Sequence, residues 1–160
     1  MIGIIPIGSR PAGQCFEDRI MNEYKLSDIT TGMEESFDVT VTDKMMEAFR
    51  EITGDTNPLH TDPKFAAESG NKDRVCYGLL TSSFLSTLAG VYLPGRYSLI
   101  RSVEVKFVKP VYPGDELTVK GTVTEVNTDF SFFDMKVEIR NAEGEKVLRG
   151  KMQVGVTDMA

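Results

Sequence analysis

Residues 75–95 read VCYGLLTSSFLSTLAGVYLPG and contain no charged side chain. A helix over residues 78–92 would be apolar on most of its faces, which predicts that protein covers it on several sides. A membrane span is the competing interpretation, but the segment before Pro94 is shorter than the ~20 mainly apolar residues that a bilayer requires. It also carries five hydroxyl residues, namely Thr81, Ser82, Ser83, Ser86 and Thr87. We therefore predict a buried helix and no membrane span.

After this helix, apolar residues recur at every second position of the sequence. Val103, Val105 and Phe107 alternate with polar residues, as in a strand with one buried face. Three further rows of the same kind cover residues 117–123, 133–139 and 148–156. Turn-forming residues separate the rows, so neighbouring strands are expected to pair as antiparallel hairpins. A meander is the most economical topology for these strands.

The residues before the helix predict one more strand and two shorter helices. Residues 37–41 alternate as a half-buried strand does. A helix follows, with Thr42 as its N-cap and Gly54 as a left-handed stop. Its apolar positions are Met45, Met46, Phe49 and Ile52. A second helix is predicted over residues 63–69, and the loop DTNPLH, residues 55–60, separates the two.

These elements predict an α+β domain in which a curled antiparallel sheet wraps around one long central helix, because that arrangement buries the apolar side of both. The sheet would keep exposed edge strands, and pairing with a second copy of the chain would cover one of them. A homodimer is therefore expected. Residues 1–20 are expected to be a disordered extension, and residues 21–160 a single domain.

Composition excludes several classes of protein. The 160 residues have a net charge of −6, whereas proteins that bind nucleic acid carry clustered positive charge. The two cysteines lie far apart without a neighbouring histidine, which fits neither a disulfide framework nor a metal site and indicates a cytoplasmic protein. The chain has one histidine, so any mechanism that uses an imidazole depends on His60.

Asp55 and His60 are the candidate acid/base pair. Pro58 lies between them and disfavours helical geometry at Asn57, so the two side chains can converge from a bent loop. The long helix begins shortly afterwards at Gly78, where a free backbone N–H can polarise a carbonyl group. The alternative is purely structural, because turns of this composition are common and a lone histidine often has no catalytic role.

Two other polar residues of the uncharged segment have simpler explanations. Ser86 must hydrogen bond to a partner or back to its own helix. Cys76 has apolar neighbours and no second histidine to activate it, which predicts a buried, unreactive thiol.

The chain resembles the MaoC-like family of (R)-specific enoyl-CoA hydratases from about Phe37 to Val156. The matching segments are ITGDTNPLHTDPKFA (52–66), YGLL (77–80), LPG (93–95) and SVEVKFVKPVYPGDELTV (102–119). The resemblance implies a hot-dog fold, a dimer, and reversible hydration of trans-2-enoyl thioesters, on CoA or acyl carrier protein, to (R)-3-hydroxyacyl thioesters. It implies no metal and no redox cofactor.

The resemblance also implies roles for individual residues. Asp55 and His60 match the catalytic pair that activates a water molecule, and Gly78 matches the backbone donor to the thioester oxygen. Asn57 matches an amide that shapes the site, and Ser86 matches a hydroxyl that helps to orient the aspartate. The family usually has histidine where this chain has Tyr77, and we expect this change to alter the acyl pocket or substrate preference.

Two other functions stay open at the level of sequence. Hot-dog proteins include thioesterases, in which water attacks C1 of the acyl group in place of C3. A non-catalytic module that binds acyl thioesters is the other possibility, although the presence of both Asp55 and His60 speaks against it.

Overall fold

The computed structural model describes residues 19–157, and residues 1–18 and 158–160 lie outside the described part of the chain. The expectation of a disordered extension over residues 1–20 therefore falls almost wholly outside it and stays a prediction. Arg19, at the start of the described part, contacts the domain. Its guanidinium carbon lies 4.8 Å from the centre of the Phe37 ring, and it donates a hydrogen bond of 2.8 Å to the Tyr92 hydroxyl.

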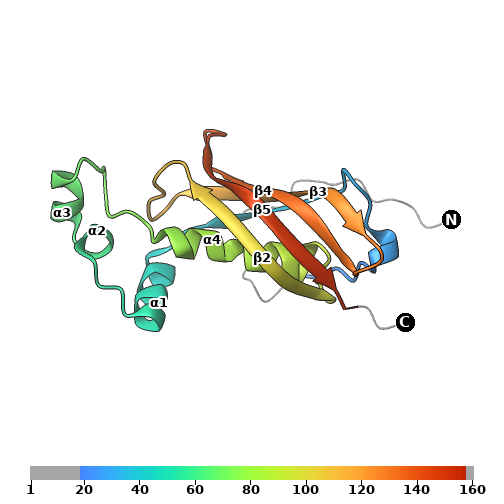
Figure 1. Cartoon of the computed structure of the whole chain (residues 1–160). Helices are drawn as coiled ribbons and strands as arrows, with labels where there is room; N and C mark the ends of the chain where they lie inside the picture. Colours follow the sequence, from blue (N-terminus) through green and yellow to red (C-terminus); the bar gives the residue numbers. More distant parts are fainter. Residues whose placement is uncertain (1–18, 158–160) are drawn as a thin grey trace.

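A five-stranded antiparallel sheet forms one layer of the domain. Its strands are β1 (Glu34–Thr40), β2 (Ser98–Phe107), β3 (Glu116–Asn127), β4 (Phe132–Arg140) and β5 (Lys146–Val156). The helix α4 (Gly78–Thr87) runs along the sheet, and a π-helical turn, η3 (Leu88–Tyr92), extends it (Figure 1). The predicted α+β hot-dog arrangement, with a curled sheet around a central helix, is confirmed.

The order of the strands is β1-β3-β4-β5-β2. The predicted meander is right for β3, β4 and β5, which pair as consecutive hairpins. It is wrong for β2, which pairs with β5 and not with β3. The reason is that β1 and β4 occupy the two edges of β3, so β2 cannot pair with β3 and pairs with the free edge of β5. As a result β2 forms an edge of the sheet.

The core lies between the sheet and α4. Alternate residues of β3, β4 and β5 are buried, and Leu80, Thr81, Phe84 and Leu85 of α4 pack against them. Burial of α4 is one-sided, because Leu79 is 66% exposed and Ser86 is exposed as well. The prediction that protein covers this helix on several sides is therefore met on one face only within a single chain.

Three helices lie beyond one end of the sheet (Figure 1): α1 (Asp43–Thr53), α2 (Pro58–Thr61) and α3 (Pro63–Glu68). The Thr42 side chain accepts a hydrogen bond from the Met45 N–H, and Gly54 has a φ of 73°, so the predicted start and stop of α1 are confirmed. Of the four apolar positions of this helix, Ile52 does not join the core, since it is 81% exposed. A short 3-10 turn, η2 (Leu26–Asp28), precedes β1.

Gly150 gives a direct test of the sheet, because it sits on β5 opposite Val105 of β2 and Val137 of β4. A Cβ atom at this position would lie 2.0 Å from the Glu104 carbonyl oxygen. We expect Gly150→Ala to lower the free energy of unfolding by about 3 kcal/mol, because backbone must move to admit the methyl group. Urea denaturation measures the change.

Gly90→Ala is the matched control, because no heavy atom lies within 4 Å of a Cβ atom built there. We expect it to change the free energy of unfolding by less than about 1 kcal/mol. Equal stability of Gly150→Ala and the wild type would contradict the close approach of β2 and β5.

Candidate active site

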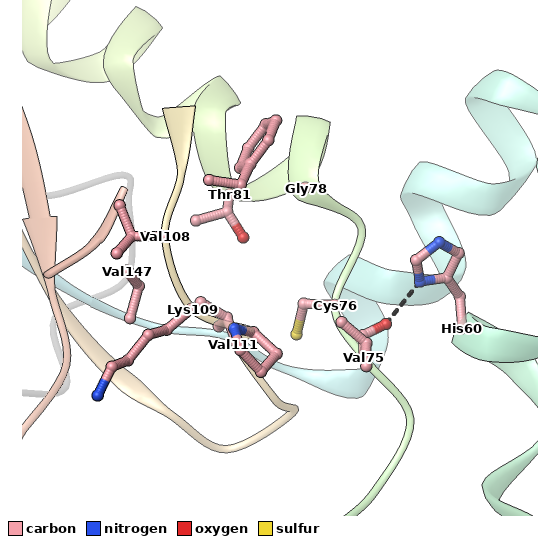
Figure 2. A pocket seen from close by; sticks show the side chains of 11 residues that line it. His60, Val75, Cys76, Gly78, Thr81, Val108, Lys109, Val111 and Val147 are labelled. Atoms are coloured by element: carbon pink, nitrogen blue, oxygen red, sulfur yellow. Dashed lines mark hydrogen bonds between the residues drawn. The ribbon is translucent and has the colours of Figure 1, made fainter. Parts of the chain in front are cut away.

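A pocket of about 360 Å³ opens between α2, the start of α4 and the segment that follows β2 (Figure 2). Its lining is mainly apolar and includes one imidazole and one helix start. The lining residues are His60, Val75, Cys76, Gly78, Thr81, Phe107, Val108, Lys109, Pro110, Val111 and Val147. The pocket therefore unites His60 and Gly78, which lie 18 positions apart in the sequence.

His60 lies on α2 and is half-buried. Its Nδ1 atom is 2.6 Å from the Val75 carbonyl oxygen, the contact drawn as a dashed line in Figure 2. A carbonyl oxygen can only accept, so Nδ1 carries the proton. In the neutral imidazole, Nε2 is then the unprotonated nitrogen, which can accept a proton or a hydrogen bond from water.

Asp55 follows the left-handed residue Gly54 and is exposed. Its Oδ1 atom accepts a hydrogen bond of 3.0 Å from the Asn57 N–H, which closes a local turn. Asn57 in turn caps α2, because its Oδ1 atom accepts a hydrogen bond of 2.9 Å from the Leu59 N–H. This chain of local bonds connects the Asp55 carboxylate to the helical turn that carries His60.

The helical turn α2 is an element that the sequence prediction missed. A proline at the first helical position and an asparagine as N-cap are the signals that could have revealed it. The turn is only four residues long, which is too short for the helical periodicity of apolar residues to appear in the sequence. His60 therefore lies on a helical turn, where the sequence predicted a bent loop.

Gly78 is the first residue of α4, as predicted. The N–H groups of the first helical turn have no acceptor within the helix, and the positive end of the helix dipole lies there. A Cβ atom at this position would lie 3.2 Å from two carbon atoms of the Phe107 ring. Glycine therefore lets Phe107 pack directly over the start of α4, where the ring also lines the pocket.

Tyr77 connects the two candidate residues, a link that sequence reasoning missed. Its hydroxyl donates a hydrogen bond of 2.7 Å to the backbone carbonyl oxygen of Asp55, and its ring centre is 4.1 Å from that of His60. Burial is the main cause that raises the pKa of this phenol above its usual value, so the hydroxyl keeps its proton. Tyr77 is not among the residues that line this pocket, and the expectation that it alters the acyl pocket or substrate preference stays a prediction.

Neither the Cys76 thiol nor the Ser86 hydroxyl bonds to His60 or Asp55 in residues 19–157, although Cys76 lines the same pocket as His60. Burial raises the pKa of the Cys76 thiol to about 12, so this residue is protonated at neutral pH, as expected of an unreactive cysteine. Ser86 lines a second pocket of about 300 Å³, near Gly95 and Leu99. At a rise of about 1.5 Å per residue, it lies about 12 Å along the helix from Gly78. The structure brings His60 and Gly78 into one pocket, links Asp55 to His60 through Asn57 and Tyr77, and leaves Ser86 at another pocket.

No helix within residues 19–157 combines the length and the apolar character needed to cross a membrane.

Comparison with known proteins identifies the class. The sequence model of the MaoC like domain matches residues 26–146. An (R)-specific enoyl-CoA hydratase from Aeromonas caviae is 34% identical over 107 residues, which cover 67% of this chain and 80% of that protein. An (R)-specific enoyl-CoA hydratase from Rhodospirillum rubrum is 29% identical over 140 residues, 88% of this chain and 95% of that protein.

Solved structures agree with the sequence relatives. The (R)-hydratase from Aeromonas caviae involved in PHA biosynthesis superimposes with a TM-score of 0.77 at 29% identity, over 80% of this chain and 97% of that one. The unliganded R-hydratase from Pseudomonas aeruginosa has the same fold, with a TM-score of 0.80 at 24% identity, over 88% of this chain and 89% of that one. The protein is a hydro-lyase with a hot-dog fold. It belongs to the MaoC-like domain family.

Proposed function

We propose that this protein catalyses the reversible hydration of trans-2-enoyl thioesters to (R)-3-hydroxyacyl thioesters. The observation that carries the proposal is the placement of His60 and Gly78 in one mainly apolar pocket, with Nε2 of His60 unprotonated. Asp55 is bonded through Asn57 to the helical turn that carries His60, and its backbone accepts a hydrogen bond from Tyr77. The relatives named above, two (R)-specific enoyl-CoA hydratases, support the substrate class and the stereochemistry.

Each of the three residues has a task in the proposed mechanism. The Asp55 carboxylate accepts a proton from a water molecule whose oxygen attacks C3 of the enoyl group. The electron pair of the C2–C3 double bond moves toward the thioester carbonyl, and the Gly78 N–H, at the start of α4, stabilises the negative charge on that oxygen. His60 orients the water through Nε2. The proton that Asp55 took from the water is then delivered to C2 with the assistance of His60, which regenerates the Asp55 carboxylate. The net change is addition of one water molecule across the double bond.

The test is incubation of the purified protein with crotonyl-CoA. We expect the ultraviolet absorbance of the enoyl group to fall, the product to be (R)-3-hydroxybutyryl-CoA, and free thiol to stay at the level of the blank. Acyl carrier protein carrying the same acyl group is the second substrate. Release of free thiol without loss of the double bond would indicate a thioesterase. Binding without either change would indicate a binding module.

We further propose that the protein is a homodimer formed through β2. This strand is at the edge of the sheet, so one side of its backbone has no partner strand within residues 19–157. Its side chains include several exposed apolar ones: Leu99, Ile100, Val103 and Phe107. Two copies of an antiparallel edge can pair with each other about a two-fold axis, which would satisfy the backbone groups and cover these side chains.

Leu99→Lys tests the dimer, because Leu99 is 55% exposed on the edge strand. Analytical ultracentrifugation of the wild type is expected to give about twice the chain mass of 17.8 kDa. The charged side chain is expected to raise the dissociation constant of the dimer at least about tenfold, because it would be buried without a partner. The control is Ile52→Lys, which changes an apolar residue that is 81% exposed on α1 and should leave the mass unchanged. A wild type that sediments as a monomer would contradict the proposal.

A further inference from the structure

The Tyr77 side chain contacts both candidate catalytic residues, through its hydroxyl at Asp55 and its ring at His60. Only 3% of its surface is exposed, and it occupies the position directly before α4. Its hydroxyl hydrogen bonds to the backbone of Asp55, not to the carboxylate. The bond therefore holds the peptide unit that carries the carboxylate without occupying either carboxylate oxygen, and Oδ1 keeps its hydrogen bond from the Asn57 N–H.

The ring of Tyr77 fixes His60 on a second side. It lies between two other aromatic rings, with centre-to-centre distances of 4.1 Å to His60 and 5.0 Å to Phe49 of α1. The imidazole is thus held by its Nδ1 atom at the Val75 carbonyl and by its face at Tyr77. Both restraints come from one short segment, residues 75–77, so they fix the plane of the imidazole and the direction of Nε2 together.

The segment that carries these restraints is itself fixed. The Val75 N–H donates a hydrogen bond of 3.1 Å to the Leu59 carbonyl, and the Cys76 N–H donates one of 2.7 Å to the Val111 carbonyl. The first bond joins the segment to α2 and the second joins it to the residues that follow β2. Tyr77 is therefore anchored to the body of the domain, whereas the Asp55 turn lies on the exposed surface.

We propose that Tyr77 is a positioning residue that holds the Asp55 carboxylate and the His60 imidazole in the relative placement that hydration requires. The proposal rests on the proposed function. The Tyr77 side chain is buried, its hydroxyl is bonded to Asp55 and its ring lies against His60, so it acts through these two residues. A displacement of about 1 Å between reacting groups can lower a rate by about 100-fold. A residue that fixes the relative placement of Asp55 and His60 is therefore expected to affect kcat.

Tyr77→Phe tests the hydroxyl, because it removes one atom and keeps the ring against His60. We expect kcat for crotonyl-CoA to fall by about 10- to 100-fold, with KM changed by less than about two-fold, since the pocket lining is unaltered. Circular dichroism and the melting temperature show whether the variant is folded. The matched control is Tyr24→Phe, which removes a hydroxyl that hydrogen bonds to Glu35 at 2.9 Å on another part of the domain. This control should keep wild-type kcat.

Tyr77→Leu tests the ring and has a readout that does not depend on activity. His60 is the only histidine of the chain, so a tag-free protein gives a single imidazole Cε1–H signal in the NMR spectrum. We expect this signal to be displaced by the Tyr77 ring current in the wild type and in Tyr77→Phe. In Tyr77→Leu it should move toward the position of free imidazole, and kcat should fall further.

The outcomes separate the two proposals. Hydration by the wild type with unchanged kcat in a folded Tyr77→Phe would overturn the role of Tyr77 and leave the proposed function intact. An increase in KM with unchanged kcat would also overturn it, because Tyr77 would then act on substrate binding. Absence of hydration by the wild type would overturn the proposed function, and the positioning role that rests on it would fall with it.

Discussion

Asp55→Asn is expected to lower kcat for hydration of crotonyl-CoA by about 10²- to 10⁴-fold, the range that a general base contributes. The amide has nearly the same shape as the carboxylate and can still accept the hydrogen bond from the Asn57 N–H. The local turn should therefore persist, and the loss should come from the missing proton acceptor. Initial rates of absorbance decrease under saturating substrate measure the effect.

Asp129→Asn is the matched control for Asp55→Asn, since Asp129 is an exposed aspartate of the turn between β3 and β4. Its activity should equal that of the wild type. If Asp55→Asn kept more than about one tenth of wild-type kcat, the carboxylate would not be the base. We would then infer that His60 is the sole acid/base group.

His60→Gln is expected to lower kcat by about 10²- to 10⁴-fold as well, because glutamine cannot exchange a proton at neutral pH. Gln is long enough to hydrogen bond to the Val75 carbonyl, so the contact that His60 makes there can be replaced in part. Steady-state kinetics at saturating substrate give the loss in kcat, and the melting temperature shows whether the fold is retained.

The double variant Asp55→Asn/His60→Gln shows whether the two residues act as a unit. If both act on one water molecule, the loss in the double variant should be close to the larger of the two single losses, not their product. Multiplied losses would indicate that Asp55 and His60 contribute to separate steps. Such a result would contradict the shared water molecule of the proposed mechanism.

Much of the fold could be predicted from the sequence because the decisive patterns are local. Residues 78–92 lack charge, and the following segments alternate with period two, which determines one buried helix and an apolar sheet face. Thr42, Gly54 and Asp62 act at helix ends through bonds to backbone within a few residues, so the limits of α1 and α3 were also predictable.

The pairing of β2 with β5 could not be predicted in the same way, because strand order depends on contacts between distant segments. The outward position of Ile52 shows the same limit, since a helical period does not reveal where the covering layer ends. The half-exposed face of α4 shows that a segment without charge can be buried on one side only within a single chain.

The candidate site was predictable in part. The spacing of Asp55 and His60 around Pro58 identified both residues, and the start of the uncharged helix identified Gly78. The link through Tyr77 depends on a side chain 22 positions from Asp55 in sequence, and no pattern encodes such a contact. Ser86 was placed near the site by resemblance alone, and within the single chain it lies by another pocket.

The most direct test of the central claim is the destination of the water oxygen. Crotonyl-CoA is incubated with the wild-type protein in H₂¹⁸O, and the products are analysed by mass spectrometry. Hydration predicts ¹⁸O in the hydroxyl group at C3 of an intact 3-hydroxybutyryl-CoA, with no label in free acid. Label in the carboxylate of free crotonic acid, with the double bond retained, would contradict it and assign attack to C1.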